Sequence, residues 1–245
     1  FSPDLITMGG MLMSETLGVF LIALTAYLFF RFFRSTVKPL WLILLSAVFF
    51  SFAVMTRTPS ALIALPAAFY LFKEKRWKEI FVAIIAIVLI FSPWVLRNYK
   101  VYGVFVPTNL AYGVDLSFGN HSGATGELEH YELPYENIKK YGYVEGNREN
   151  AKEAMRFIAN SPLEFLKITF YRISIYFSFA RPTGFWFHLE GFSKVATLVL
   201  SAIYSAVIFV LGFLGMVFSR NVAEEDKKAA RYLLAFVLMA PLSVI

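Results

Sequence analysis

Long apolar runs alternate with short polar loops along this chain, and the runs have the length of membrane-spanning helices. The run 80–96 holds 17 uncharged residues, which rise about 25 Å as a helix and nearly match the hydrocarbon core of a bilayer. The pattern predicts an all-α polytopic membrane protein with about six transmembrane helices. The expected helices cover residues 14–33, 39–56, 58–72, 80–96 and 195–219, and the sixth begins near Tyr232.

The charges of the connecting loops predict how these helices are oriented. The loops after the first, third and fifth runs are rich in lysine and arginine, whereas the turn between the second and third runs holds only Arg57. This alternation follows the positive-inside rule, so the basic loops are expected to be cytoplasmic. Glu15, Arg57 and Arg97 then fall at the outer face of the membrane.

One long polar section divides the chain into three expected parts. Residues 1–97 and 195–245 form the membrane helices, and residues 98–194 form an extracytoplasmic section. The first half of this section is rich in Gly, Asn and Tyr and is predicted to be loop. A helix is expected from Asn147 onward, because apolar residues then recur at helical spacing.

A second helix of the outer section is expected to start at Ser161-Pro162-Leu163-Glu164, a capping box with proline at the first helical position. Lys167 and Arg172 interrupt its apolar row, so the helix is predicted to lie in or dip into the membrane interface. The alternative is a spanning helix, which would break the alternation of loop charge. The apolar row comprises Phe165, Ile168, Tyr171, Ile175 and Phe179.

Composition agrees with a membrane protein. The chain is 58% hydrophobic and only 16% charged, which is too apolar for a soluble domain of this length. Its net charge of +6 sits in short loops between apolar runs, so membrane lipids are the expected partners and nucleic acid is not. Cysteine is absent, which excludes disulfides and thiolate metal sites. The chain begins with Phe1 and ends inside an apolar run, so it is expected to be a fragment of a longer protein.

Several short motifs follow one another along the chain in a recognisable order. The most specific is Pro93-Trp94-Val95-Leu96-Arg97-Asn98-Tyr99, followed by Gly103 at the end of an apolar run. The others are Ser14-Glu15-Thr16-Leu17, Thr56-Arg57-Thr58-Pro59-Ser60, Asn109 to Gly113 and Phe118-Gly119-Asn120. This order resembles the integral-membrane, type C glycosyltransferases, and more narrowly it is similar to the bacterial group related to the dolichyl-phosphate-mannose protein mannosyltransferases.

The resemblance implies a hexosyl- or mannosyl-type transferase in a bacterial inner or plasma membrane. Such an enzyme moves a sugar from a polyprenyl-phosphate donor to a glycan, lipid or protein acceptor at the outer face. The catalytic carboxylate of the family lies in the first outer loop, which no residue of this chain matches. The general base is therefore expected upstream of Phe1, and the fragment alone is expected to be inactive.

The chemistry of such a transfer selects candidate residues. The leaving phosphate needs fixed cations and donors beside it, and arginine suits this role because its planar guanidinium binds phosphate oxygens in pairs. Arg97 is the leading candidate for binding the donor phosphate, with Asn98 and Tyr99 as supporting donors. The alternative is that Arg97 and Tyr99 are interfacial anchors, which are common at membrane helix ends.

Glu15 is the second candidate and the one residue of this chain proposed for a catalytic role. An ionisable residue beside a membrane segment indicates function, and the resemblance implies an acidic residue facing the active cavity here. The alternative is a first-turn acid that favours the helix dipole. Arg57 is a weaker candidate for the donor phosphate, and a structural ion pair with Glu15 is the equal alternative.

The outer section also holds the three histidines of the chain. Their spacing to nearby acidic residues fits no compact metal motif, so no metal and no cofactor is expected. Two other functions stay open, a transporter or flippase of lipid-linked substrates and a non-catalytic membrane assembly subunit. A transporter should carry charged or broken helices at mid-membrane, whereas the second, fourth and fifth runs are uncharged. The residues considered for a metal are His121, His130, His188, Glu127, Glu129 and Glu132.

Overall fold

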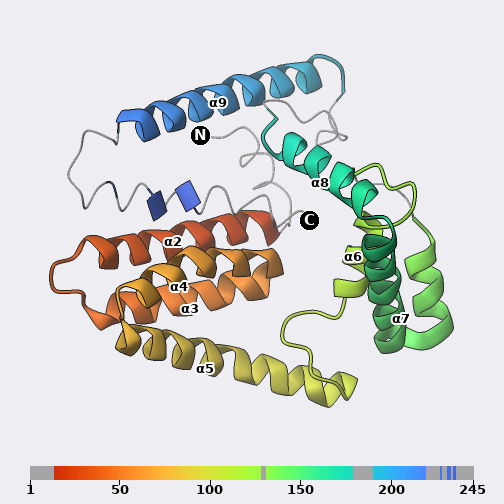
Figure 1. Ribbon diagram of the computed structural model, residues 1–245, viewed down its shortest axis with the longest axis horizontal. Helices are drawn as coiled ribbons and strands as arrows, with labels where there is room; N and C mark the ends of the chain where they lie inside the picture. The colour runs from red at the N-terminus through yellow and green to blue at the C-terminus, as the bar shows by residue number, and fades with distance from the viewer. Residues whose placement is uncertain are drawn as a thin grey trace. The chain divides into compact units, whose positions relative to one another are not determined.

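A computed structural model describes residues 14–127, 131–178 and 190–218, together with residues 227, 231, 232, 234 and 235. All regular elements within these residues are helices, which confirms the all-α part of the predicted fold class. The described residues form two compact units. The first combines the residues before Phe91 with those after Tyr176, and the second runs from Phe91 to Tyr176. Each unit is described separately below, with the element labels of Figure 1.

The first unit is built around a pair of neighbouring helices, α2 (Ser14–Arg34) and α3 (Leu40–Thr56). They pack side by side along their length, and the 3₁₀ helix η1 (Thr58–Ile63) and α4 (Ala64–Lys73) follow (Figure 1). Helix α5 (Trp77–Tyr102) starts in this unit, and α9 (Gly191–Phe218) belongs to it.

Among the described residues, three helices are long and apolar enough to cross a membrane. These are Thr16–Arg34, Trp77–Tyr102 and Gly191–Gly215, and the 17-residue helix α3 is apolar but shorter. The predicted run 58–72 is wrong as one continuous helix, because it divides into η1 and the ten-residue α4. Proline cannot donate to a helical ladder, and Pro59 accordingly lies at the start of η1. The predicted sixth helix lies mostly outside the described residues.

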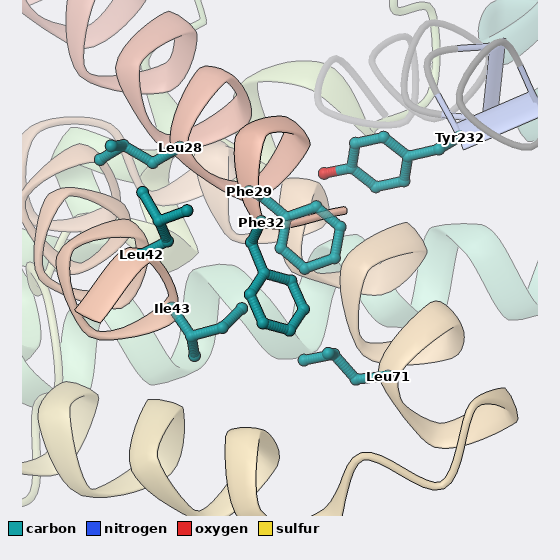
Figure 2. Close-up of a cluster of buried hydrophobic side chains, with 7 residues drawn as sticks. All are labelled: Leu28, Phe29, Phe32, Leu42, Ile43, Leu71 and Tyr232. Carbon is teal, nitrogen blue, oxygen red and sulfur yellow. The ribbon is translucent and has the colours of Figure 1, made fainter. Parts of the chain in front are cut away.

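The core of the first unit is a cluster of buried apolar side chains from α2, α3 and α4, with Tyr232 beside them (Figure 2). Phe32 is completely buried, and the ring of Phe29 meets that of Tyr232 with centroids 5.0 Å apart. Small polar residues also join α2 to α3. Oγ of Ser46 on α3 donates a hydrogen bond to the carbonyl of Thr25 on α2 over 3.1 Å. Such bonds are typical of helices packed within a membrane.

The second unit contains more helix than the sequence predicted. Helix α6 (Tyr112–Gly119) and the first part of α7 (Leu133–Asn160) occupy residues that were expected to be loop. Helix α7 reverses direction at Gly142, where φ of 78° and ψ of 172° lie outside the helical region, a conformation that glycine adopts at little cost. Helix α8 (Pro162–Tyr176) starts at the proline that the capping pattern predicted.

Buried asparagines explain why the loop prediction failed in this unit. Nδ2 of Asn137 donates to Oδ1 of Asn150 over 2.7 Å, and Nδ2 of Asn150 donates to the carbonyl of Pro134 over 3.0 Å. Asn147 is fully buried, and its Nδ2 donates to the carbonyl of Tyr143 over 2.8 Å. Asparagine has a low helix propensity, but the bonds of Asn150 to Asn137 and Pro134 join the two parts of α7, whereas the bond of Asn147 to Tyr143 lies within the second part.

Candidate functional site at the end of helix α5

Helix α5 carries the leading candidate residue, Arg97, directly after its uncharged stretch. Arg97 lies more than one turn before the end of the helix at Tyr102, and the last turn contains Lys100, where cations are favoured by the helix dipole. The helix closes at Gly103, whose φ of +70° is left-handed and whose N–H donates to the carbonyl of Tyr99 over 2.9 Å. This closure explains the glycine of the motif, because other residues rarely adopt this conformation.

The loop after α5 folds back onto the helix and is held there by two of its side chains. Nε1 of Trp94 donates to the carbonyl of Thr108 over 2.7 Å. Nδ2 of Asn98 donates to the carbonyls of Val106 and Thr108 over 3.0 and 3.2 Å. Asn98 is only 1% exposed. Its amide donors are therefore engaged by the main chain, which makes it a support of the site rather than a phosphate donor.

The guanidinium of Arg97 is oriented by these same two residues. Its Nη1 donates to Oδ1 of Asn98 over 3.0 Å, and its Cζ lies 5.3 Å from the ring centroid of Trp94. Cation–π contacts of this length are attractive. The side chain of Arg97 remains exposed to solvent, so the cation is held in place without being buried.

Within the part of the chain that the structure describes, no carboxylate pairs with Arg97. An arginine has five N–H donors, and the bond to Asn98 uses one of them. The remaining donors suit the paired oxygens of a phosphate or a carboxylate. Tyr99, the third predicted donor, is 58% exposed. The site is thus an accessible cation with the ring of Trp94 against it.

The other two candidate residues belong to the first unit. Arg57 lies between α3 and η1, and its N–H donates to the carbonyl of Ala53 over 2.8 Å. Its side chain packs against α2, since a Cβ added to Gly18 would lie 3.4 Å from Cγ and Cδ of Arg57. Glu15 is one turn before Gly18 in the same helix, but its side chain lies outside the described residues. The structure thus brings Arg57 to the helical turn that carries Glu15.

Two charged residues of the second unit have roles that the sequence analysis did not predict, one as a titratable group and one as a structural hydrogen-bond donor. Asp115 lies in the first turn of α6, where partial burial raises the pKa of its carboxyl. Arg172 of α8 is buried, with Nη2 donating to the carbonyl of Gly119 and Nη1 to Oδ1 of Asn120 over 3.5 Å. Neither role could be predicted from the local sequence pattern, because both depend on how α6 and α8 pack.

The loop that contains His121 packs against tyrosine side chains. The ring of His121 stacks on that of Tyr131 with centroids 3.8 Å apart, and Glu127 accepts a hydrogen bond from the hydroxyl of Tyr171 over 2.7 Å. Among the described residues, no group of three or more His, Cys, Asp or Glu side chains could hold a metal ion. His130, Glu129 and His188 lie outside the described residues.

Comparisons of this chain with known protein families, with curated proteins and with solved structures found no match.

Proposed function

We propose that this chain is the membrane part of a glycosyltransferase that uses a polyprenyl-phosphate sugar donor. In this proposal the chain has about six membrane helices in a bacterial inner or plasma membrane, and residues 98–194 face the extracytoplasmic side. One observation carries it. Arg97 presents an exposed guanidinium, oriented by Trp94 and Asn98, where a helix long enough to cross a membrane reaches its end.

The proposed role of Arg97 is to bind the phosphate of the donor and to stabilise it as it leaves. An acceptor hydroxyl attacks the anomeric carbon of the sugar, and the bond from that carbon to the phosphate oxygen breaks. The oxygen keeps the electron pair, so negative charge builds up on the polyprenyl phosphate. Paired hydrogen bonds from a guanidinium strengthen as this charge develops and lower the barrier.

Trp94 and Asn98 support this role by fixing the guanidinium before the donor binds. A cation already held in position does not lose side-chain freedom during the reaction, which makes its hydrogen bonds more effective. A residue that only anchors a helix at the membrane surface does not need such an arrangement, since a flexible lysine would serve equally well.

The proton of the acceptor hydroxyl must pass to a carboxylate. Glu15 is the candidate from the sequence for this catalytic role, and Arg57 is a further candidate for the donor phosphate. Both assignments rest on sequence order and on the resemblance described above.

The experiment that tests the proposal is a transfer assay with the intact protein in lipid vesicles, using a polyprenyl-phosphate sugar as donor. We expect the wild-type protein to release polyprenyl phosphate and to form a glycosylated acceptor. Arg97→Ala should lose this activity, whereas Arg148→Ala, which changes an exposed arginine of α7 paired with Glu145, should keep it. Movement of the intact donor across the bilayer without sugar release would instead identify a flippase and overturn the proposal.

A further inference from the structure

The outward face of helix α8 carries a row of exposed apolar side chains. Leu163 is 82% exposed, Leu166 46% and Phe170 68%. Their spacing of three and then four residues places them on one face of the helix. Large apolar side chains gathered on one exposed face indicate a surface that contacts something other than water.

The opposite face of α8 is fixed to the second unit, which sets the rotation of the helix about its axis. Ile168, Thr169 and Arg172 are buried there, and Arg172 donates hydrogen bonds to Gly119 and Asn120 at the end of α6. The apolar row expected from the sequence included Ile168, which the structure places on the inner face instead. Arg172 therefore does not interrupt the outward row, because it points into the protein.

The order of elements along the chain favours a place for α8 near a membrane surface. The second unit begins within α5, and α8 ends at Tyr176, shortly before α9 begins at Gly191. Both α5 and α9 are long and apolar enough to cross a membrane. Helix α8 has 15 residues, which rise about 22 Å and fall short of the roughly 30 Å of a bilayer core. A helix of this length at this place in the chain suits the surface of the membrane rather than its interior.

We propose that α8 lies flat on the lipid surface, with Leu163, Leu166 and Phe170 inserted below the headgroups. Lys167 is exposed on the same side of the helix, and a lysine stem can lie along acyl chains while its ammonium reaches the phosphates of the lipids. The second unit would thereby be attached to the membrane along α8 as well as through α5. This inference does not depend on sugar transfer, since it concerns only the contact between α8 and lipid.

Spin labels on single cysteines test the contact, and the chain has no native cysteine to interfere. Leu163→Cys, Leu166→Cys and Phe170→Cys are labelled in the intact protein, reconstituted in vesicles of phosphatidylcholine and phosphatidylglycerol. The control is Lys152→Cys, which changes an exposed residue on α7. We expect a higher ratio of oxygen to water-soluble nickel collision rates at the three α8 positions than at Lys152, because oxygen concentrates in lipid.

The same measurement separates the alternatives. A helix lying flat places the three labels at similar depth, whereas a spanning helix would separate positions 163 and 170 by about 10 Å along the membrane normal. Ratios equal to that at Lys152 would show a face in water and overturn the proposal. Low collision rates with both reagents would show a face covered by protein, from this chain or a second copy, and would also overturn it.

Discussion

Nη1 of Arg97 donates a hydrogen bond over 3.0 Å to Oδ1 of Asn98, the next residue in the chain. Asn98 thus links a solvent-exposed cation to the buried side of α5, where its own amide holds the returning loop. A change at Asn98 should therefore affect both the loop and the orientation of the guanidinium.

The first prediction concerns the loop. Asn98→Ala removes the donor for the carbonyls of Val106 and Thr108, and leaving a buried acceptor unsatisfied costs about 1–3 kcal/mol. We expect a lower free energy of unfolding and faster hydrogen exchange of the amides of residues 103–106 and 108. Asn160→Ala is the matched control, because Asn160 is exposed at the end of α7. Equal exchange in the two variants would show that Asn98 does not hold the loop.

The second prediction concerns the contact between α6 and α7. A Cβ at Gly113 would overlap the carbonyl oxygen of Asn147 and lie 2.7 Å from its carbonyl carbon. Because both atoms belong to the main chain, they cannot move without shifting a helix. Gly113→Ala should destabilise the second unit by at least the roughly 1–3 kcal/mol that overpacking usually costs. The control Gly212→Ala places its Cβ in open space in α9 and should be at least as stable as wild type, because alanine favours a helix more than glycine does. Similar stability of both variants would contradict the close packing.

The third prediction is a pH dependence at Asp115. Burial raises the pKa of this carboxyl above its ordinary value of 3.8, so the folded protein holds a proton that the unfolded chain has already released. Stability therefore falls as the pH rises from the unfolded pKa through the raised folded pKa, and it stays lower at neutral pH. Asp115→Asn removes this loss. It should unfold at higher temperature than wild type at pH 7, and the difference should vanish near pH 3.

Glu149 provides a control of opposite sign for that experiment. A hydrogen bond from Lys152 lowers the pKa of its carboxyl, with Nζ 2.5 Å from Oε1. Its contribution is present above the ordinary pKa and is lost as the pH falls through the lowered folded pKa. Glu149→Gln should therefore be less stable than wild type at pH 7 and equal to it in acid. The same sign for Asp115→Asn and Glu149→Gln would contradict the assignment of Asp115.

The fourth prediction concerns orientation in the membrane. Cysteines at Thr36 and Glu74, both exposed residues in loops expected to be cytoplasmic, should be shielded from an impermeant thiol reagent in intact cells. Cysteines at Lys139 and Lys152, both exposed on α7, should react. Positions such as Asn147 are unsuitable, because this side chain is fully buried. Labelling of position 74 from outside would reverse the assignment of the loops.

The sequence predicted well what depends on neighbouring residues and poorly what depends on tertiary contacts. The proline at position 162 located the start of α8, since its backbone restriction acts locally. The uncharged run 80–96 located the apolar part of α5, but the helix continues to Tyr102 and does not end at Arg97. The hydrogen bond of Trp94 to Thr108 joins residues 14 positions apart, and the local sequence pattern does not predict it. Likewise, the helical form of residues 133–141 depends on buried asparagine bonds, for which intrinsic propensity gives no indication.

The assignment of inward and outward faces in α8 failed for a related reason. Apolar residues line more than one side of this helix, so periodicity alone could not decide which side packs on the protein. The decision comes from Arg172, whose hydrogen bonds to the end of α6 fix the rotation of the helix. Of the two charged residues that interrupt the apolar row in the sequence, Arg172 thus lies on the buried side of the helix, whereas Lys167 is exposed.

The last prediction tests Arg97 by separating its charge from its geometry. Arg97→Lys keeps the positive charge but loses the planar pair of donors and the bond from the guanidinium to Asn98. If Arg97 binds the donor phosphate, Lys should transfer sugar clearly more slowly than wild type, and Ala more slowly still. Loss of one such donor typically costs about 2–4 kcal/mol of transition-state stabilisation, or roughly 30- to 1000-fold in rate.

The measurement is the initial rate of sugar transfer by equal amounts of folded Arg97→Lys, Arg97→Ala and wild-type protein in vesicles. Lys100→Ala is the control, because Lys100 is an exposed cation three residues after Arg97 in α5 but has no comparable contact with Trp94 or Asn98 in the described structure. It should transfer sugar like wild type. A lysine at position 97 could still reach the lipid headgroups if the residue were only an interfacial anchor. Full activity of Arg97→Lys with a modest loss in Arg97→Ala would therefore exclude the phosphate-binding role.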